Sequence, residues 1–279
     1  MLLQRVITAV VLLALLLPAL FAPVSWPFAV LSLVLIAAAG WEWARLNGVA
    51  KIAAVGPGLL LALAGAWALH TGAAARVSPA VWWGVSAAWL VFGAVALRAG
   101  PSGWPSSPAP LRLFVGLLVL WFAWMALAQA RALSVNFVLS ALCVVWVADI
   151  GAYFAGRTFG RRKLAPSISP GKTWEGVAGG MVGVFALALS WLAVVDASWP
   201  VDGTSLFAHV RAKTGLGGLA LACAVLAGLS VVGDLFESLV KRAAGAKDSS
   251  RLLPGHGGVL DRIDALLPVL PAVMALRSL

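Results

Sequence analysis

The chain has 279 residues, of which 62% are hydrophobic and 11% charged, and its mean hydropathy is +0.99. Soluble domains are about 45–50% apolar and about 25% charged, and disordered chains have low hydrophobicity, so both classes are excluded. Since a transmembrane helix uses about 20 apolar residues, the composition supplies about eight or nine spans. We predict one all-α polytopic membrane domain, with its chemistry in the loops and at the ends of the spans.

The net charge of +10 would suggest nucleic-acid binding in a soluble protein. In a membrane protein it is better explained by positively charged inner loops and by attraction to anionic lipid, so no nucleic-acid partner is expected. Cys143 and Cys223 lie in apolar runs and show neither disulfide nor metal-ligand spacing.

Apolar runs divide the chain into about nine segments. They lie at 6–22, 24–41, 52–70, 79–97, 112–131, 134–156, 176–195, 215–233 and 263–279. The first run follows Arg5 and imitates a signal peptide, but the eight runs after it favour an uncleaved anchor. The last run contains Asp264, Pro268 and Pro271, and it either spans the membrane or lies partly in the interface.

The distribution of Lys and Arg predicts the orientation. With the N-terminus inside, fifteen of the twenty basic residues fall on the inner side and five (Arg76, Arg131, Arg211, Lys213 and Arg277) on the outer side. The charged loops 157–175 and 234–262 then share the inner face and are joined by a helical hairpin, so we expect them to meet.

A linker rich in Pro, Gly and Ser, at 98–112, separates the first four runs from the rest. All acidic residues except Glu42 follow it, which predicts a scaffold at 1–110 and a catalytic membrane half at 111–279. In the seventh run Gly176, Gly179, Gly180 and Gly183 form overlapping small-residue pairs, a pattern typical of close helix packing.

The segment 233–264 holds half of the ten acidic residues. Asp234 ends a run, and on a continuing helix Glu237, Ser238 and Lys241 would share its face. Asp248, Asp261 and Asp264 flank a glycine-rich turn at 254–258. Carboxylates mixed with Lys and Arg are typical of a Mg²⁺ site that also holds phosphates, whereas the alternative is weak surface ion pairs. Zinc is disfavoured because the three histidines, His70, His209 and His256, lie far apart in the chain.

The second charged loop contains Gly171-Lys172-Thr173, but Pro166 stands where a Walker A motif needs glycine, and no strand is expected before it. We predict a basic loop that leads into a helix near Thr173, so that Lys172 lies where a helix start favours an anion. Asp149 lies inside the sixth run, and an acidic residue within a membrane span is a candidate for function. The alternative, held equal, is a structural hydrogen bond to Tyr153 or a neighbour.

These segments resemble the phosphatidate cytidylyltransferase (CDP-diacylglycerol synthase) family. The resemblance is carried by S-x-x-K-R-x4-K-D from Ser238, P-x-H-G-G-x-x-D-R-x-D from Pro254, KLAPSISPGKTWEG from Lys163 and DIGAYFAGRTFG from Asp149. It covers about the last 130 residues, and it implies about nine spans, a need for Mg²⁺ and a homodimer. We expect a bacterial inner membrane, with the active site facing the cytoplasm as the charge distribution indicates.

The implied reaction joins CTP and phosphatidate to give CDP-diacylglycerol and diphosphate. Asp234 and Asp261 are the first expected metal ligands and Asp248 and Asp264 the next. Phosphates would be bound by Lys172, Lys241, Arg242, Lys247 and Arg262; His256, Gly257, Gly258 and Ser238 would approach the nucleotide. Two alternatives stay open. A secondary transporter should show interrupted helices in repeated halves, whereas here charge is confined to one half. A CDP-alcohol phosphotransferase should show a D-x2-D-G…G-x3-D-x3-D pattern, which is not found in the sequence.

Overall fold

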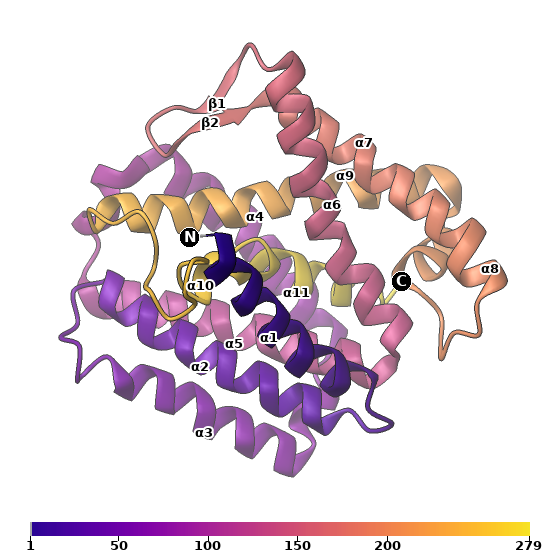
Figure 1. The fold of residues 1–279 in the computed structure, drawn as a ribbon, viewed down its shortest axis with the longest axis horizontal. Coiled ribbons are helices and arrows are strands. Elements are labelled where there is room, and N and C mark those ends of the chain that lie inside the picture. The colour runs from indigo at the N-terminus through magenta and orange to yellow at the C-terminus, as the bar shows by residue number, and fades with distance from the viewer. Residues whose placement is uncertain (1) are drawn as a thin grey trace. The chain divides into compact units, whose positions relative to one another are not determined.

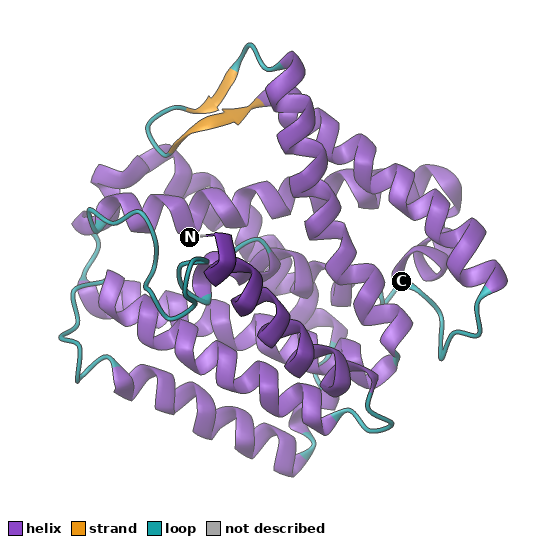
Figure 2. Ribbon diagram, viewed as in Figure 1, coloured by secondary structure: helices purple, strands orange, loops and turns teal. Residues whose placement is uncertain are grey.

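A computed structural model describes the backbone of residues 2–279 and the side chains of Gln4 and residues 6–279; Arg5, counted above among the inner charges, lies outside the described side chains. Helices dominate the chain, as Figure 2 shows. The α-helices, labelled in Figure 1, are α1 (Leu2–Phe21), α2 (Trp26–Leu46), α3 (Val55–Thr71), α4 (Pro79–Gly103), α5 (Ala109–Leu133), α6 (Val135–Phe159), α7 (Trp174–Ser190), α8 (Asp196–Ser198), α9 (Leu206–Ala243), α10 (Leu260–Ile263) and α11 (Leu266–Leu276). Short 3₁₀ turns lie at Ala73–Ala75 and Trp104–Ser106, and a π turn at Trp191–Val195.

Six helices in the described part of the chain are long and apolar enough to cross a membrane, and two shorter apolar helices accompany them. The long segments are Trp26–Leu46, Pro79–Ser106, Ala109–Leu133, Val135–Phe159, Trp174–Ser198 and Leu206–Ala243; the shorter ones are Val6–Phe21 and Val55–Thr71. The chain is therefore an all-α polytopic membrane protein, as predicted, while the count of nine spans is not confirmed.

The last apolar run forms α11, and Asp264 and Ala265 before it also keep right-handed helical φ and ψ, so the helical backbone continues from α10. Every residue from Leu267 to Ala275 is buried. Its apolar character therefore comes from burial in protein.

Two helices bend at a glycine with positive φ. In α4 the kink is at Gly100 (φ 70°), directly before Pro101, inside the segment predicted as a linker. In α9 it is at Gly215 (φ 71°), where the eighth apolar run was predicted to begin. A left-handed residue interrupts a helix, and glycine adopts it without a steric penalty.

The chain forms two compact units that interleave along the sequence. The first unit contains 1–77, 99–132 and 237–264, and the second contains 78–98, 133–236 and 265–279. Their boundaries do not coincide with the predicted division at residue 110, and the assignment of catalysis to 111–279 stays a prediction. The boundary inside α9 falls between Phe236 and Glu237.

In the first unit, α2 and α3 pack closely through glycines. A Cβ atom on Gly58 would lie 2.6 Å from the carbonyl oxygen of Ala37, so only glycine allows this approach. On α5, the buried Arg131 donates from Nε to the carbonyl oxygen of Leu20 (2.8 Å) and from Nη2 to that of Ala22 (2.6 Å). Arg131 thus caps the end of α1, a structural role for one of the five charges assigned to the outer side.

In the second unit, α6 and α7 pack through the glycines predicted for this purpose. Cβ atoms on Gly176 and Gly180 would lie 2.9 and 2.8 Å from the carbonyl oxygens of Ala152 and Ala148. Since these oxygens belong to α6, larger residues would force the two helices apart. The close packing predicted for the seventh run is confirmed.

A small antiparallel hairpin, β1 (Lys163–Ala165) and β2 (Ser169–Thr173), precedes α7. The expectation of a loop without strands was wrong here. The strands were not predicted because Pro, Gly and Ser interrupt them and alternation of apolar residues is lacking. Lys172 lies within β2, whereas a Walker A lysine follows its strand, so the rejection of that motif holds.

Candidate active site

A cavity of about 440 Å³ opens in the second unit beside the β-hairpin, and we call it the hairpin pocket. Residues from α6, β2, α7 and α9 line it, among them Asp149, Tyr153, Arg157, Lys172, Thr173 and Asp234. It thus combines two carboxylic acids, on α6 and α9, with two basic side chains, Arg157 and Lys172. Such a lining suits a ligand that carries both phosphate and a cation.

The hairpin pocket holds an ion pair between Lys172 Nζ and Asp234 Oδ2, 2.5 Å apart. The two side chains retain 22% and 29% of their exposed area, so both remain accessible to a ligand. Asp149 lines the same cavity, while the hydroxyl of Tyr153 accepts a hydrogen bond from Arg157 Nη1 (3.0 Å). The pocket places Asp149 with predicted site residues, which favours its functional interpretation.

Local interactions fix the position of Lys172. Thr173 is the N-cap of α7, and its hydroxyl accepts the N–H of Gly176 (3.1 Å). Glu175, in the first turn, accepts the backbone N–H groups of Arg161 (3.1 Å) and Arg162 (3.2 Å). The helix start near Thr173 is confirmed, and Lys172 precedes it directly.

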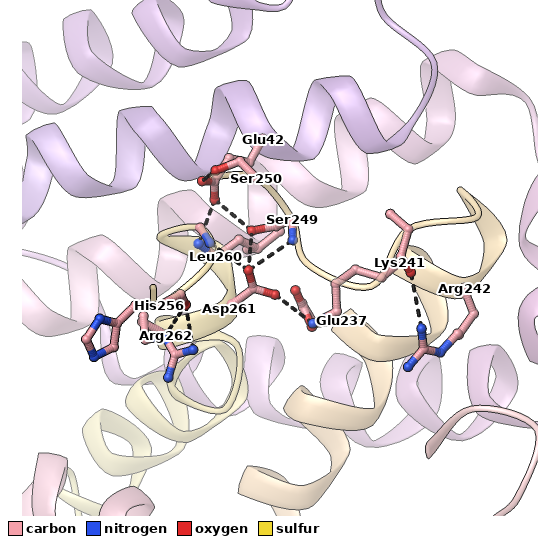
Figure 3. Close-up of polar contacts among 12 residues, drawn as sticks. Glu42, Glu237, Lys241, Arg242, Ser249, Ser250, His256, Leu260, Asp261 and Arg262 are labelled. Atoms are coloured by element: carbon pink, nitrogen blue, oxygen red, sulfur yellow. Dashed lines mark hydrogen bonds and ion pairs between the residues drawn. The ribbon is translucent and has the colours of Figure 1, made fainter. Parts of the chain in front are cut away.

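In the first unit, the segment 247–262, which we call the signature loop, is organised by the carboxylate of Asp261 (Figure 3). Asp261 Oδ2 accepts the N–H of Gly258 (2.7 Å) and both the N–H and the hydroxyl of Ser249 (2.9 Å each). Burial alone would raise the pKa of Asp261, but the bond from Lys241 and these N–H donors outweigh it and bring the pKa to about 2. Asp261 is therefore an ionised carboxylate at neutral pH.

Lys241 lies between two buried carboxyl groups. Its Nζ is 2.5 Å from Glu237 Oε2 and 2.7 Å from Asp261 Oδ1. The exposed fractions of the Glu237 and Asp261 side chains are only 1% and 7%. These contacts favour a structural role for Lys241, and its predicted binding of phosphate stays a prediction.

Two predicted phosphate-binding arginines donate to nearby carbonyl groups. Arg242 Nη1 donates to Ala246 (3.2 Å), and Arg262 donates from Nε and Nη2 to His256 (3.0 and 2.6 Å). Figure 3 shows both guanidinium groups beside the carbonyl oxygens they bind. Both arginines therefore hold local turns, and their predicted binding of phosphate stays a prediction.

A second cavity, of about 690 Å³, lies along the signature loop. Its lining includes Lys247, Asp248, Arg251, His256, Gly257 and Arg262. Lys247 and Asp248 are exposed. Three bases against one acid make this cavity suitable for an anionic group.

The remaining predicted site residues have identifiable places in the first unit. A Cβ on Gly257 (φ 85°) would lie 2.6 Å from Asp261 Oδ2, and one on Gly258 would overlap Ser249 Oγ and Glu42 Oε1. Asp264 ends α10, and Ser238 is half-buried on α9. Only glycine at these two positions leaves room for the carboxyl groups of Asp261 and Glu42. The predicted approach of Gly257 and Gly258 to a nucleotide stays a prediction.

Glu42 is the site residue that sequence reasoning missed. It is fully buried on α2 and accepts hydrogen bonds from residues of the signature loop. A lone acid directly after the apolar run 24–41 was the available signal, since an acid at membrane depth is costly without partners.

The four expected metal ligands belong to different compact units of the chain. Asp234 lies in the second unit, while Asp248, Asp261 and Asp264 lie in the first, so the expected convergence of Asp234 and Asp261 on one cation stays a prediction. Among the described residues, no group of three or more His, Cys, Asp or Glu side chains could hold a metal ion by itself.

Comparison with known proteins supports the motif analysis over the whole chain. Residues 3–279 match the model of the cytidylyltransferase family. A phosphatidate cytidylyltransferase of Pseudomonas aeruginosa is 38% identical over 299 aligned positions, covering 99% of this chain and 97% of that protein. Those of Haemophilus influenzae and Bacillus subtilis are 50% and 40% identical, over 46% and 52% of this chain and 41% and 49% of their own lengths. With its signature loop and hairpin pocket, the chain belongs to the cytidylyltransferase family, and it is a nucleotidyltransferase of the membrane.

Proposed function

We propose that this protein transfers a cytidylyl group from CTP to phosphatidate, giving CDP-diacylglycerol and diphosphate for phospholipid synthesis. The observation that carries the proposal is the hairpin pocket, in which Asp149, Asp234 and Lys172 line one cavity. Arg157 lies in the last turn of α6 and Lys172 precedes the start of α7, which suits a substrate whose acyl chains stay in lipid while its phosphate reaches water. The names of the relatives support the same substrates.

In the proposed reaction, a phosphate oxygen of phosphatidate attacks the α-phosphorus of CTP. The bond from the α-phosphorus to the oxygen that bridges to the β-phosphorus breaks, and diphosphate leaves. No covalent enzyme intermediate is required. Catalysis then depends on alignment of the two phosphates and on neutralisation of their charge. Lys172 is suited to this role in the hairpin pocket, and Lys247 and Arg262 are suited to it in the cavity of the signature loop.

The donor set of the hairpin pocket fits Mg²⁺. This ion usually takes one or two carboxylates and completes its shell with water and substrate phosphates. Asp149 and Asp234 supply two carboxyl groups to one cavity. Bound there, Mg²⁺ would supply Lewis-acid polarisation of a phosphoryl oxygen, and Lys172, which pairs with Asp234, would bind phosphate oxygens beside it.

The direct test is incubation of the purified protein in detergent with phosphatidate, labelled CTP and Mg²⁺. Labelled CDP-diacylglycerol and an equal amount of diphosphate are expected, and both should be absent when EDTA replaces Mg²⁺. Label that enters lipid from CDP-alcohol substrates, with none from CTP, would contradict the proposal.

Of the basic residues in and beside the hairpin, we expect Lys172 to contribute to catalysis and Arg161 to contribute little. Lys172→Ala is expected to lower kcat/KM by about ten- to a hundredfold, the value of a lost charge-assisted hydrogen bond. Arg161→Ala removes an exposed charge but keeps the backbone N–H of residue 161, which donates to Glu175. This variant should change kcat/KM less than about twofold. Equal kinetics for the two variants would show that the hairpin bases serve topology only.

We propose that the hairpin and the signature loop face the cytoplasm, in a bacterial inner membrane, on the basis of the charge distribution. Ser167 and Ala244 are exposed, whereas Ser250 is buried, so cysteines belong at the first two positions, in a background without Cys143 and Cys223. An impermeant thiol reagent should label both only after the cells are opened. Labelling of either in intact cells would refute the orientation. The homodimer implied by the resemblance remains part of the proposal.

A further inference from the structure

Glu42 holds the two ends of the signature loop with a symmetric set of hydrogen bonds. Oε1 accepts the hydroxyl of Ser250 (2.5 Å) and the N–H of Val259 (3.0 Å). Oε2 accepts the hydroxyl of Ser249 (3.2 Å) and the N–H of Leu260 (2.7 Å). Each carboxyl oxygen therefore binds one serine and one backbone amide, and Figure 3 shows Glu42 above these loop residues.

These bonds fix the part of the loop that carries its charges. Lys247 and Asp248 come directly before Ser249, and Asp261 and Arg262 come directly after Leu260. Because Glu42 binds residues 249–250 and 259–260, it fixes the backbone next to all four charged residues. Its own exposed fraction is 0%, so Glu42 is not accessible to a ligand and can act only through the loop.

The effect of Glu42 extends to the buried ion pairs through Ser249. The hydroxyl of Ser249 lies 3.2 Å from Glu42 Oε2 and 2.9 Å from Asp261 Oδ2, and Asp261 in turn binds Lys241. A hydroxyl has one hydrogen, so it donates to one carboxyl group at a time. Any displacement of Glu42 would therefore change the hydrogen bonding of Asp261.

Gly258 provides an independent sign that the fit is tight. A Cβ there would overlap both Glu42 Oε1 and Ser249 Oγ. Gly258→Ala would hence push the loop away from Glu42 while leaving the glutamate itself unchanged.

We propose that Glu42, on the N-terminal helix α2, is a positioning residue for cytidylyl transfer: it sets the conformation of the signature loop whose charged side chains contact the substrates. The inference rests on the proposed function for its catalytic consequence. It gives the N-terminal segment, expected from the sequence to be scaffold, a defined part in the active site.

The test is Glu42→Gln, which keeps size but replaces one oxygen by an amide group. In either amide orientation one backbone N–H, that of Val259 or of Leu260, loses its acceptor, and the adjacent serine hydroxyl no longer has a Glu42 oxygen to donate to. We expect kcat per folded protein to fall about tenfold or more, and hydrogen exchange of a peptide containing Val259 and Leu260 to become about tenfold faster or more. Gly258→Ala should show the same two changes, and Ser250→Ala a smaller version of both.

The matched control is Asp196→Asn in the second unit. Asp196 accepts hydrogen bonds from the side chains of Asn136 (2.8 Å) and Ser205 (2.6 Å), at the end of α6 remote from Asp149. This variant should lose thermal stability but keep kcat and the exchange rate of the signature loop.

The outcomes separate the two proposals. Glu42→Gln and Ser250→Ala proteins with lower melting temperature, unchanged kcat per folded molecule and unchanged loop exchange would overturn the positioning role. If Glu42→Gln cannot be purified in folded form, Ser250→Ala and Gly258→Ala decide by the same readouts. A folded wild-type protein that makes no CDP-diacylglycerol would refute the proposed function instead, while the exchange rates still decide whether Glu42 positions the loop.

Discussion

Asp234→Asn is expected to lower the turnover of cytidylyl transfer by about 10²–10³-fold while the protein stays folded and inserted. The substitution keeps the size of the side chain but removes the negative charge beside Lys172 in the hairpin pocket. Removal of one preorganised charge-stabilising group from an active site costs about this much. Since a weaker metal site is filled at higher metal concentration, raising Mg²⁺ should restore part of the activity. Turnover against Mg²⁺ concentration measures both effects.

The control for this variant is Asp202→Asn. Asp202 accepts the N–H groups of Val135 (2.6 Å) and Asn136 (3.0 Å) at the start of α6, so it serves as a cap. Its loss should reduce stability by about 1 kcal/mol and leave turnover and the Mg²⁺ requirement unchanged. Folded Asp234→Asn protein with near-normal transfer at limiting Mg²⁺ would end the assignment of Asp234 as a metal ligand.

Lys241→Met should reduce the free energy of unfolding by about 3–5 kcal/mol, the usual result of removing one partner from a buried ion pair. The ammonium group bridges Glu237 and Asp261, so its loss leaves two buried carboxyl groups without their cation. Intrinsic tryptophan fluorescence during heating in detergent measures the change, because the chain has 14 tryptophans.

The adjacent Arg242 offers a matched comparison. It carries the same charge, but it is exposed and donates to the carbonyl of Ala246, so Arg242→Met should alter stability by less than about 0.5 kcal/mol. Adding Glu237→Gln to Lys241→Met should recover part of the loss, since one uncompensated carboxyl group is then neutral. Equal melting temperatures for the Lys241 and Arg242 variants would show that the bridge contributes nothing to stability.

Most of the fold followed from the length and apolar character of the runs. The predicted runs 24–41, 112–131 and 134–156 correspond to α2, α5 and α6, because a span must satisfy its backbone within a helix. The same signal left open whether 263–279 spans the membrane or lies partly in the interface. A helix buried in protein and a helix exposed to lipid are equally apolar, and only the three-dimensional structure shows that α11 is enclosed.

The site was predicted where its residues are local in the chain. Lys172 was identified because it directly precedes a helix start, and the charges of the signature loop because they are close in sequence. Glu42 was not, since its donors are 207 to 218 residues away and no periodicity relates them. The structural role of Lys241 was also hidden: its spacing to Glu237 is visible in the sequence, but its second partner, Asp261, follows after a turn of unpredictable path.

The cap on α1 has a consequence for the order of biosynthesis. Arg131 is made 111 residues after Leu20, whose carbonyl it binds. At about 5–20 residues per second, the ribosome reaches it about 5–20 s after α1 is complete. During that interval the carbonyl groups of Leu20 and Ala22 lack the two hydrogen bonds that Arg131 donates in the folded protein. The end of α1 is therefore completed only after α5 has been synthesised.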